Sequence, residues 1–143
     1  MKALTLWQPW ASLVAVGAKR IETRSWSTDY RGPLAIHAAK RIPPEYYRLA
    51  SEDVEFRRGV LQHLGDPLDL GDLPRGAVVA TCKLVKVVLV RIPPATGEIE
   101  AIFGDFTPGR YAWILANVEP LDRPIPAQGS QGLWEWQPPE VLR

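Results

Sequence analysis

The stretch that decides the fold is Leu4-Thr-Leu-Trp-Gln-Pro-Trp-Ala-Ser-Leu13, followed by Gly17-Ala-Lys-Arg-Ile-Glu-Thr-Arg-Ser-Trp26. It begins as a short apolar strand and continues as a helix that starts at Pro9. The proline ring pre-sets the helical backbone angle and gives up only an amide that would lack a partner there. Apolar side chains then recur at helical spacing, and Gly17 supplies a stop signal. A charged extended segment follows directly, and its position beside two tryptophans indicates a site.

Composition and charge limit the classes of protein to consider. The chain has 143 residues, of which 46% are hydrophobic and 23% charged, which fits one globular domain. Its net charge of +1 argues against a strongly basic nucleic-acid protein, but the charge is uneven: residues 1–41 carry +5 and the remainder carries −4. If the first third of the chain folds onto one side, that side faces an anion.

Cysteine, histidine and hydropathy exclude other classes. The single cysteine, Cys82, rules out an internal disulfide and fits a reducing compartment, so a cytoplasmic location is expected. With only two histidines, a structural zinc site is not expected, and we predict neither a metal nor a cofactor. No apolar run approaches the length of about 20 residues that a membrane-spanning helix needs, so no membrane partner is predicted. The oligomeric state stays open.

Hydrophobic periodicity predicts the main elements. Strands are expected at 2–6, 21–26, 33–38, 77–90 and 110–118, and helices at about 9–17 and 44–64. The run over 77–90 is too long for one flat strand, so a bend or bulge is expected near Lys83 to Lys86. Residues 120–126 are typical of a proline-punctuated connector, and 133–137 of a short final strand. Strands and helices do not strictly alternate, which predicts an α+β fold, and a closed or half-closed barrel would remove the strand edges.

Five short motifs occur in order along the chain: Leu6-Trp-Gln-Pro-Trp-Ala-Ser-Leu13, Gly17-x-Lys19-x-x-Glu22-x-Arg24-x-Trp26, Tyr30-Arg-Gly-Pro-Leu34, Tyr111-Ala-Trp-Ile114 and Gln131-Gly-Leu-Trp134. Together they resemble the ASCH domain family, whose signature is Gly-x-Lys-x-x-Glu. The resemblance spans almost the whole chain. It implies one domain over 1–143, with a PUA-like mixed β-barrel, flanking helices and a cleft.

The resemblance also implies functions. Members of the family are proposed to bind RNA or DNA, and some small bacterial members resemble amidohydrolases on acylated cytidine or ribonucleases. The amidohydrolase type uses a lysine and a threonine three residues later. Lys19 matches the lysine, but Glu22 stands where the threonine would be. Candidates for a further acidic residue are Glu98, Glu100 and Asp105.

The charged segment supplies the candidate site residues. Lys19 can hold a phosphate or act as a base, and it can equally be a cation placed near a helix C-terminus. Glu22 and Arg24 lie two residues apart and share a face of an extended segment, where they either form a plain ion pair or contact a ligand. Lys19 joins them only if it lies in the turn before the strand. Should the chain be an enzyme, Lys19 and Glu22 are the predicted catalytic pair.

Three residues complete the predicted ligand site. Trp26 ends the charged segment and is a candidate for stacking on a base. Gln8, at the helix start, can cap the helix or read a base edge. Lys40 is solvated or adds to an anion site. By contrast, Trp10 and Trp113 are expected in the core, and His37 is expected to be a hydrogen-bonded core histidine.

Three functions fit these residues. The first is a module that binds RNA or a nucleotide-like ligand in a basic cleft. The second is a small hydrolase, either a nucleoside amidohydrolase or a ribonuclease, that uses the same cleft. The third is a protein-interaction module of the transcriptional coactivator type from which the family takes its name. The charge asymmetry and the tryptophans favour RNA binding.

Overall fold

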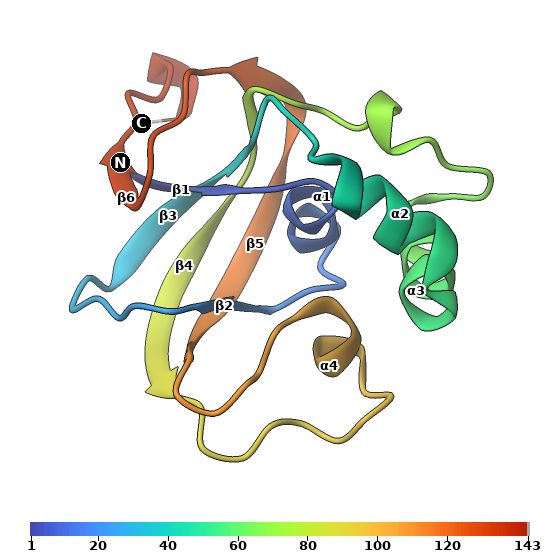
Figure 1. Cartoon of the computed structure of the whole chain (residues 1–143). Helices are drawn as coiled ribbons and strands as arrows, with labels where there is room; N and C mark the ends of the chain where they lie inside the picture. The colour runs from blue at the N-terminus through green and yellow to red at the C-terminus, as the bar shows by residue number, and fades with distance from the viewer. Residues whose placement is uncertain (143) are drawn as a thin grey trace.

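Six strands form one mixed sheet in the computed structural model, which describes residues 1–142. The spatial order is β2-β5-β4-β3-β1-β6. Strands β1 and β3 run parallel, and every other neighbouring pair is antiparallel. The sheet curls into a half-barrel (Figure 1), which confirms the predicted α+β class with a mixed barrel in its half-closed form. The strands are β1 Lys2–Leu6, β2 Ile21–Arg24, β3 Gly32–Ala38, β4 Ala77–Leu89, β5 Tyr111–Pro126 and β6 Leu133–Glu135.

Four α-helices flank one side of this sheet (Figure 1). They are α1 Trp10–Ala15, α2 Pro44–Glu52, α3 Val54–Leu64 and α4 Ile99–Phe103. Two short 3₁₀ turns, η1 Leu70–Asp72 and η2 Glu140–Leu142, complete the elements. Helix α1 lies between the sheet and the α2–α3 pair.

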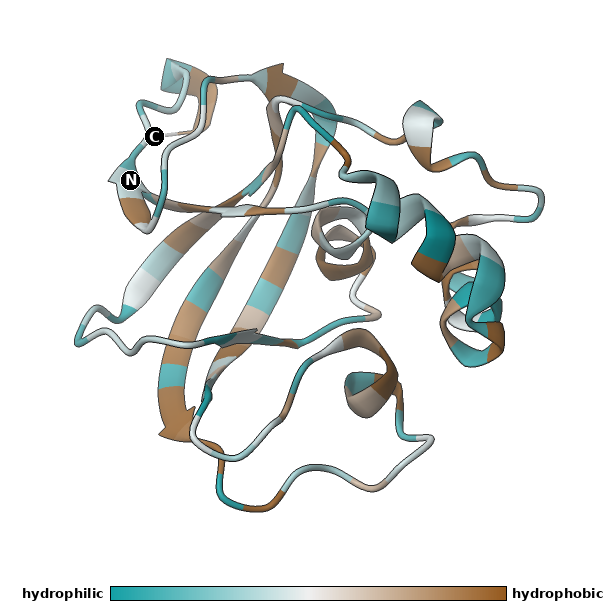
Figure 2. Cartoon of the chain, viewed as in Figure 1, coloured by the Kyte–Doolittle hydropathy of each residue, from teal (hydrophilic) through white to brown (hydrophobic). Residues whose placement is uncertain are grey.

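The central position of α1 explains its sequence. Val14 packs into the core between α1 and the sheet, whereas its neighbour Leu13 packs into a second core formed with α3 and α4. A helix that is apolar on both sides is typical of a fully buried one. Residues 77–80 at the start of β4 are apolar and all buried, whereas polar residues are interspersed along the rest of β4 and the later part of β5 (Figure 2). Trp113 on β5 is completely buried, as predicted.

Three elements differ from the sequence prediction. The helical region over 44–64 is broken at Asp53, whose carboxylate accepts a hydrogen bond from the Phe56 amide (2.9 Å) and starts α3 as a new helix. Strand β5 continues to Pro126, through the segment predicted to be a connector. Strand β2 pairs with β5 only over 111–114. Beyond that point β5 has a neighbouring strand on one edge only, so the missing N–H groups of its later prolines are tolerated there. Residues 99–103, which gave no clear pattern, form α4.

The predicted irregularity in the long strand is confirmed. The register of β4 against β5 shifts between Leu84 and Lys86, inside the expected interval, and also at two earlier points. Such bulges bend a strand and increase its twist. They allow β4 and β5 to pair over most of their length while the sheet curls.

Candidate functional site

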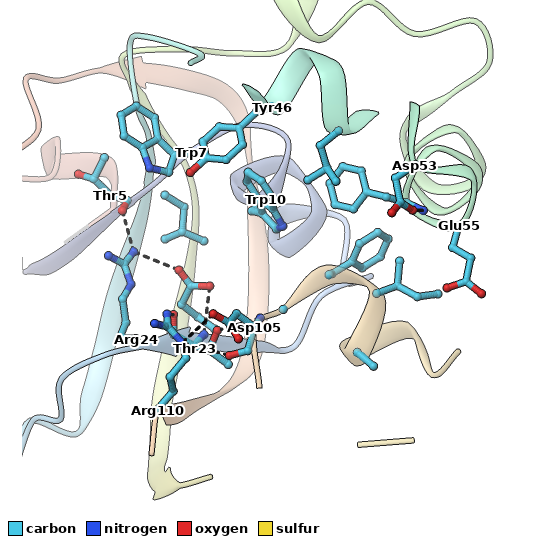
Figure 3. Close-up of a pocket in the computed structure, with 18 residues that line it drawn as sticks. Thr5, Trp7, Trp10, Thr23, Arg24, Tyr46, Asp53, Glu55, Asp105 and Arg110 are labelled. Carbon is cyan, nitrogen blue, oxygen red and sulfur yellow. Dashed lines mark hydrogen bonds and ion pairs between the residues drawn. The ribbon is translucent and has the colours of Figure 1, made fainter. Parts of the chain in front are cut away.

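A hollow of about 580 Å³, which we name the inner pocket, lies between the start of the sheet and the helices. Residues of β1 and β2, of α1 to α3 and of the 101–105 segment line it (Figure 3). Its polar lining includes Glu22, Thr23, Arg24, Asp105 and Arg110. Two of the predicted site residues, Glu22 and Arg24, therefore face one cavity.

The structure brings together Lys19, Glu22 and Arg24, which we name the charge cluster. Strand β2 begins at Ile21, so Lys19 lies in the turn before the strand, as its convergence with Glu22 requires. Lys19 Nζ lies 3.5 Å from Glu22 Oε1, and Arg24 Nη2 lies 3.1 Å from Glu22 Oε2. The carboxylate is therefore held between two cations.

Lys19 is wholly buried and does not line the inner pocket within the described residues. Its ammonium donates to the carbonyl oxygens of Ile21 (2.7 Å) and Phe103 (3.1 Å) in addition to pairing with Glu22. An ammonium has three N–H donors, and here three oxygen atoms surround it. In this arrangement Lys19 anchors Glu22 and ties α4 to the start of β2.

Glu100 fixes the same turn from the other side. Its two carboxylate oxygens accept hydrogen bonds from the backbone amides of Arg20 (3.0 Å) and Ile21 (3.3 Å). Nearby, Thr107 donates two hydrogen bonds to the Asp105 carboxylate, and these bonds, with the charge of Arg110, lower the pKa of Asp105. Of the three acidic candidates, Asp105 lines the inner pocket, while Glu100 supports it from outside and Glu98 precedes α4.

Aromatic rings form the opposite wall of the inner pocket (Figure 3). Trp10 and Tyr46 meet edge to face with ring centroids 4.7 Å apart, and Trp7 lies 5.9 Å from Tyr46. Trp7 is 41% exposed, a high value for a tryptophan. Aromatic faces beside hydrogen-bonding groups are the usual surroundings of a bound base.

A second hollow of about 1270 Å³, which we name the outer groove, adjoins the inner pocket and shares Thr5, Trp7 and Arg24 with it. Trp26 and Lys40, both predicted ligand residues, line the outer groove, together with Arg41 and Arg75. One wall is the segment 126–132. Trp26 itself rests edge to face on Trp113, with centroids 4.8 Å apart.

Arg24 stands at the boundary between the two hollows. Its Nη2 donates to the Thr5 carbonyl (2.8 Å), as Figure 3 shows, and it also pairs with Glu22. Its Nε is buried and has no hydrogen-bond partner in the described part of the chain. A buried N–H group left without an acceptor is unfavourable by about 1–3 kcal/mol, and by more when it is charged. The guanidinium therefore has donor capacity that the protein does not use.

Gln8 lies away from both hollows as far as residues 1–142 define them. Its fully buried amide donates to Ser12 Oγ (2.8 Å) and to the Pro74 carbonyl (2.7 Å), and it accepts from the Ser12 amide (3.0 Å). Of the two roles considered for Gln8, this geometry supports helix capping, with an added tie to the loop before β4.

His37 lies in the floor of the outer groove and is hydrogen-bonded at both ring nitrogens. Nδ1 lies 3.1 Å from Thr5 Oγ1, and Nε2 lies 2.7 Å from the Ala127 carbonyl. Because that carbonyl only accepts, Nε2 of the neutral ring carries the proton, and Nδ1 is an acceptor for the Thr5 hydroxyl. That hydroxyl also lies 3.4 Å from the Ser130 carbonyl oxygen, and it accepts from Trp134 Nε1 (3.1 Å). Burial lowers the pKa of His37. The floor of the groove is therefore polar and uncharged near neutral pH.

The model of the ASCH domain matches residues 4–124. This chain belongs to the ASCH domain family. It is 29% identical to activating signal cointegrator 1 of mouse and of human over 146 aligned positions, which cover 92% of this chain. The chain spans 22% of the length of those two relatives.

A solved structure supports the fold of this ASCH domain. The crystal structure of a tyrosine-to-phenylalanine mutant of the ASCH protein from Zymomonas mobilis aligns with a TM-score of 0.52 and 16% identity. The alignment covers 95% of this chain and 89% of that one. Within the described residues, no helix is long and apolar enough to cross a membrane, and no group of three His, Cys, Asp or Glu side chains is placed to hold a metal ion.

Several lining residues of this ASCH domain escaped the sequence reasoning. Trp10 was expected in the core, and it does pack against both cores, but it is partly buried and also lines the inner pocket. Tyr46 on α2 was not among the predicted site residues. Arg75 and the segment 126–132 carry no motif that points to a site. Arg41 had one available signal, its position next to Lys40.

Proposed function

We propose that this ASCH domain binds RNA or a nucleotide-like ligand, with a base held in the inner pocket. RNA binding is what the family suggests. The observation that carries the proposal is the meeting of Glu22 and Arg24, two members of the charge cluster, with the aromatic wall in one cavity. A binding module needs this combination, and no chemical step is required to account for it.

The chemistry of the lining supports a base as the bound group. The Glu22 carboxylate, fixed by two cations, is an acceptor for ring N–H, amino or ribose hydroxyl groups. Arg24 and Arg110 offer donors on the same wall. Trp7 exposes its ring on the opposite wall, which allows stacking.

A hydrolase in the same pocket is the second proposal. Of the four carboxylates that line the pocket, Glu22 and Asp105 are the ones we assign to it, because each is paired with an arginine of the same lining. Lys19 in this role would need to exchange a proton with a substrate, whereas its ammonium is enclosed by three protein oxygens. For this reason we place hydrolysis behind binding. If turnover exists, Lys19→Ala should abolish it and Lys19→Arg should not restore it, because arginine does not release its proton.

The third proposal, a protein-interaction module, draws on the similarity to activating signal cointegrator 1. It gives no role to the charge cluster or to the aromatic wall, so it ranks last. It would stand if the domain showed neither RNA binding nor turnover.

Fluorescence anisotropy with a labelled six-nucleotide single-stranded RNA tests the binding proposal. Trp7→Ala should remove one stacking contact, worth about 1–3 kcal/mol, which corresponds to a loss of about 5- to 150-fold in affinity. Tyr47→Ala is the matched control, since Tyr47 is 40% exposed but lines neither the inner pocket nor the outer groove. Absence of RNA binding by the unmodified domain, or equal losses in both variants, would overturn the proposal. The same samples are assayed for RNA cleavage and for deacylation of an acylated nucleoside.

A further inference from the structure

We propose that the outer groove is a separate binding site for the sugar–phosphate backbone of single-stranded RNA. A strand would follow this groove and deliver one base past Arg24 into the inner pocket. The inference rests on the proposed function and adds that the base and the backbone bind at two adjoining sites.

The first argument is the difference in charge between the two hollows. Four carboxylates line the inner pocket with two guanidinium groups, whereas four cations line the outer groove without any carboxylate among the described residues. A run of phosphates is therefore favoured in the groove and repelled from the pocket. The pocket accepts the part of a nucleotide that carries no negative charge, which is the base.

Second, three of the four cations of the groove are available. Lys40, Arg41 and Arg75 are exposed, and none of them forms an ion pair within residues 1–142. They come from two segments that are distant in the sequence, the start of the β3–α2 connection and the loop before β4, yet they line one hollow. Cations that are free to replace the counterions of a phosphate backbone are the source of salt-dependent binding.

The third argument is the pair of tryptophans along the groove. Trp26 lines the groove, and Trp7 lies where the groove meets the inner pocket. Proteins that bind single strands combine a cationic groove with aromatic platforms on which bases stack. A double helix offers no exposed base faces to such platforms, so the arrangement favours a single strand.

The fourth argument is that the groove is built in advance. Gly129 of the wall approaches the floor so closely that a Cβ atom there would lie 2.6 Å from His37 Cε1 and 2.8 Å from Thr5 Oγ1. The hydrogen bond from His37 to the Ala127 carbonyl fixes the same wall. A groove already held in shape loses less conformational entropy when a strand enters it.

Arg24 links the two sites. It lines both hollows, its position is fixed by Thr5 and Glu22, and its Nε lacks an acceptor. A phosphate at the boundary, reached with a small shift of the side chain, would supply that acceptor through a charge-assisted hydrogen bond. Arg24 thus marks the point at which the backbone turns away and the base continues.

The experiment measures the salt dependence of RNA affinity at 50 and 200 mM salt, with oligouridylates of one, three and six nucleotides. The double variant R41A/R75A should lower the log–log slope for the six-nucleotide RNA by about 1.4, since each lost phosphate contact contributes about 0.7. Over this interval the wild-type domain should then lose about sevenfold more affinity than the variant. The variant should also lose the gain in affinity from one to six nucleotides.

The control is R58A/R91A, which removes two exposed arginines that line neither the inner pocket nor the outer groove. It should leave the slope of the wild-type protein unchanged. If R41A/R75A also leaves the slope unchanged while the RNA still binds, the groove is not the backbone site and the proposed function survives. If the wild-type domain does not bind RNA, both proposals are overturned. Equal, Arg41- and Arg75-dependent binding of a polyaspartate peptide would overturn the assignment to RNA in favour of an acidic protein partner.

Discussion

The charge cluster and the outer groove use the same residue types in opposite ways. In the charge cluster, Lys19 is buried and enclosed by oxygen atoms, and Arg24 is tied to Glu22 and to Thr5. In the outer groove, Lys40 and Arg41 stand exposed with no ion pair within the described residues. Within 41 residues of sequence, one set of cations supports the protein and the other faces solvent.

The difference shows why the +5 charge of the first 41 residues is not a binding surface as a whole. The Lys19 ammonium is bonded to buried oxygen atoms of the protein. Lys2 pairs with Glu135 (2.8 Å), and Arg31 donates hydrogen bonds to carbonyls of its own loop. A cation whose donors are already used stabilises the fold, and one that remains solvated can exchange counterions for a ligand. The burial of a lysine and its bonding partners decide whether it stabilises the fold or binds a ligand.

The largest expected effect tests this contrast directly. Lys19→Met removes the ammonium and leaves the Ile21 and Phe103 carbonyls and the Glu22 carboxylate short of a donor. We expect the free energy of unfolding, measured with urea, to fall by about 3–5 kcal/mol, as when one partner of a buried ion pair is lost. Lys40→Met, the control, should change it by at most about 0.5 kcal/mol. Similar effects of the two substitutions would contradict the comparison.

The charge cluster was the part of the site most open to prediction. Lys19, Glu22 and Arg24 lie within six residues, so the spacing along one turn and one strand already determines whether they meet. The same holds for the main strands and for α1, where local apolar patterns and packing agree. Residues that are close together in the sequence are here also close together in space.

The outer groove and the support of the cluster depend on long-range contacts. Glu100 bonds to amides 79 and 80 residues earlier, and Gln8 bonds to the carbonyl of Pro74, 66 residues later. Arg75 joins Arg41 only because β4 pairs with β3. Similarly, the prolines of 120–126 were expected to end a strand, but pairing with β4 outweighs their local preference. Such relations follow from the topology and have no local signature.

A second prediction concerns the shape of the outer groove, which is held by packing rather than by charge. Gly129→Ala places a methyl group against His37 and Thr5 at 2.6–2.8 Å, so side chains or the wall must move. We expect a loss of about 1–3 kcal/mol in the free energy of unfolding, typical of overpacking. Gln128→Ala, at an exposed neighbouring position of the same wall, should cost at most about 0.5 kcal/mol. Unchanged stability of Gly129→Ala would show that the wall adapts freely.

The smallest expected effect is a pH dependence from the floor of the groove. Burial lowers the pKa of His37, so the folded protein binds this proton less readily than the unfolded chain does. The stability from neutral His37 is therefore complete above the unfolded pKa of about 6.5. It is lost as the pH falls from there toward the lowered folded value, with a slope of at most about 1.4 kcal/mol per pH unit.

Unfolding midpoints of the wild-type protein and of His37→Gln, measured between pH 7.5 and 5, separate this contribution from others. His63 is present in both proteins and cancels in the difference. The lowered pKa values of Asp105 and Glu135 place their effects at more acidic pH. We expect the wild-type protein to lose stability through this interval and the variant to show a flatter profile. Parallel profiles would mean that protonated His37 keeps its hydrogen-bond partners. The Thr5 hydroxyl would then have to accept a hydrogen bond from Nδ1 instead of donating one. In that case the floor of the groove would carry a positive charge at pH 5.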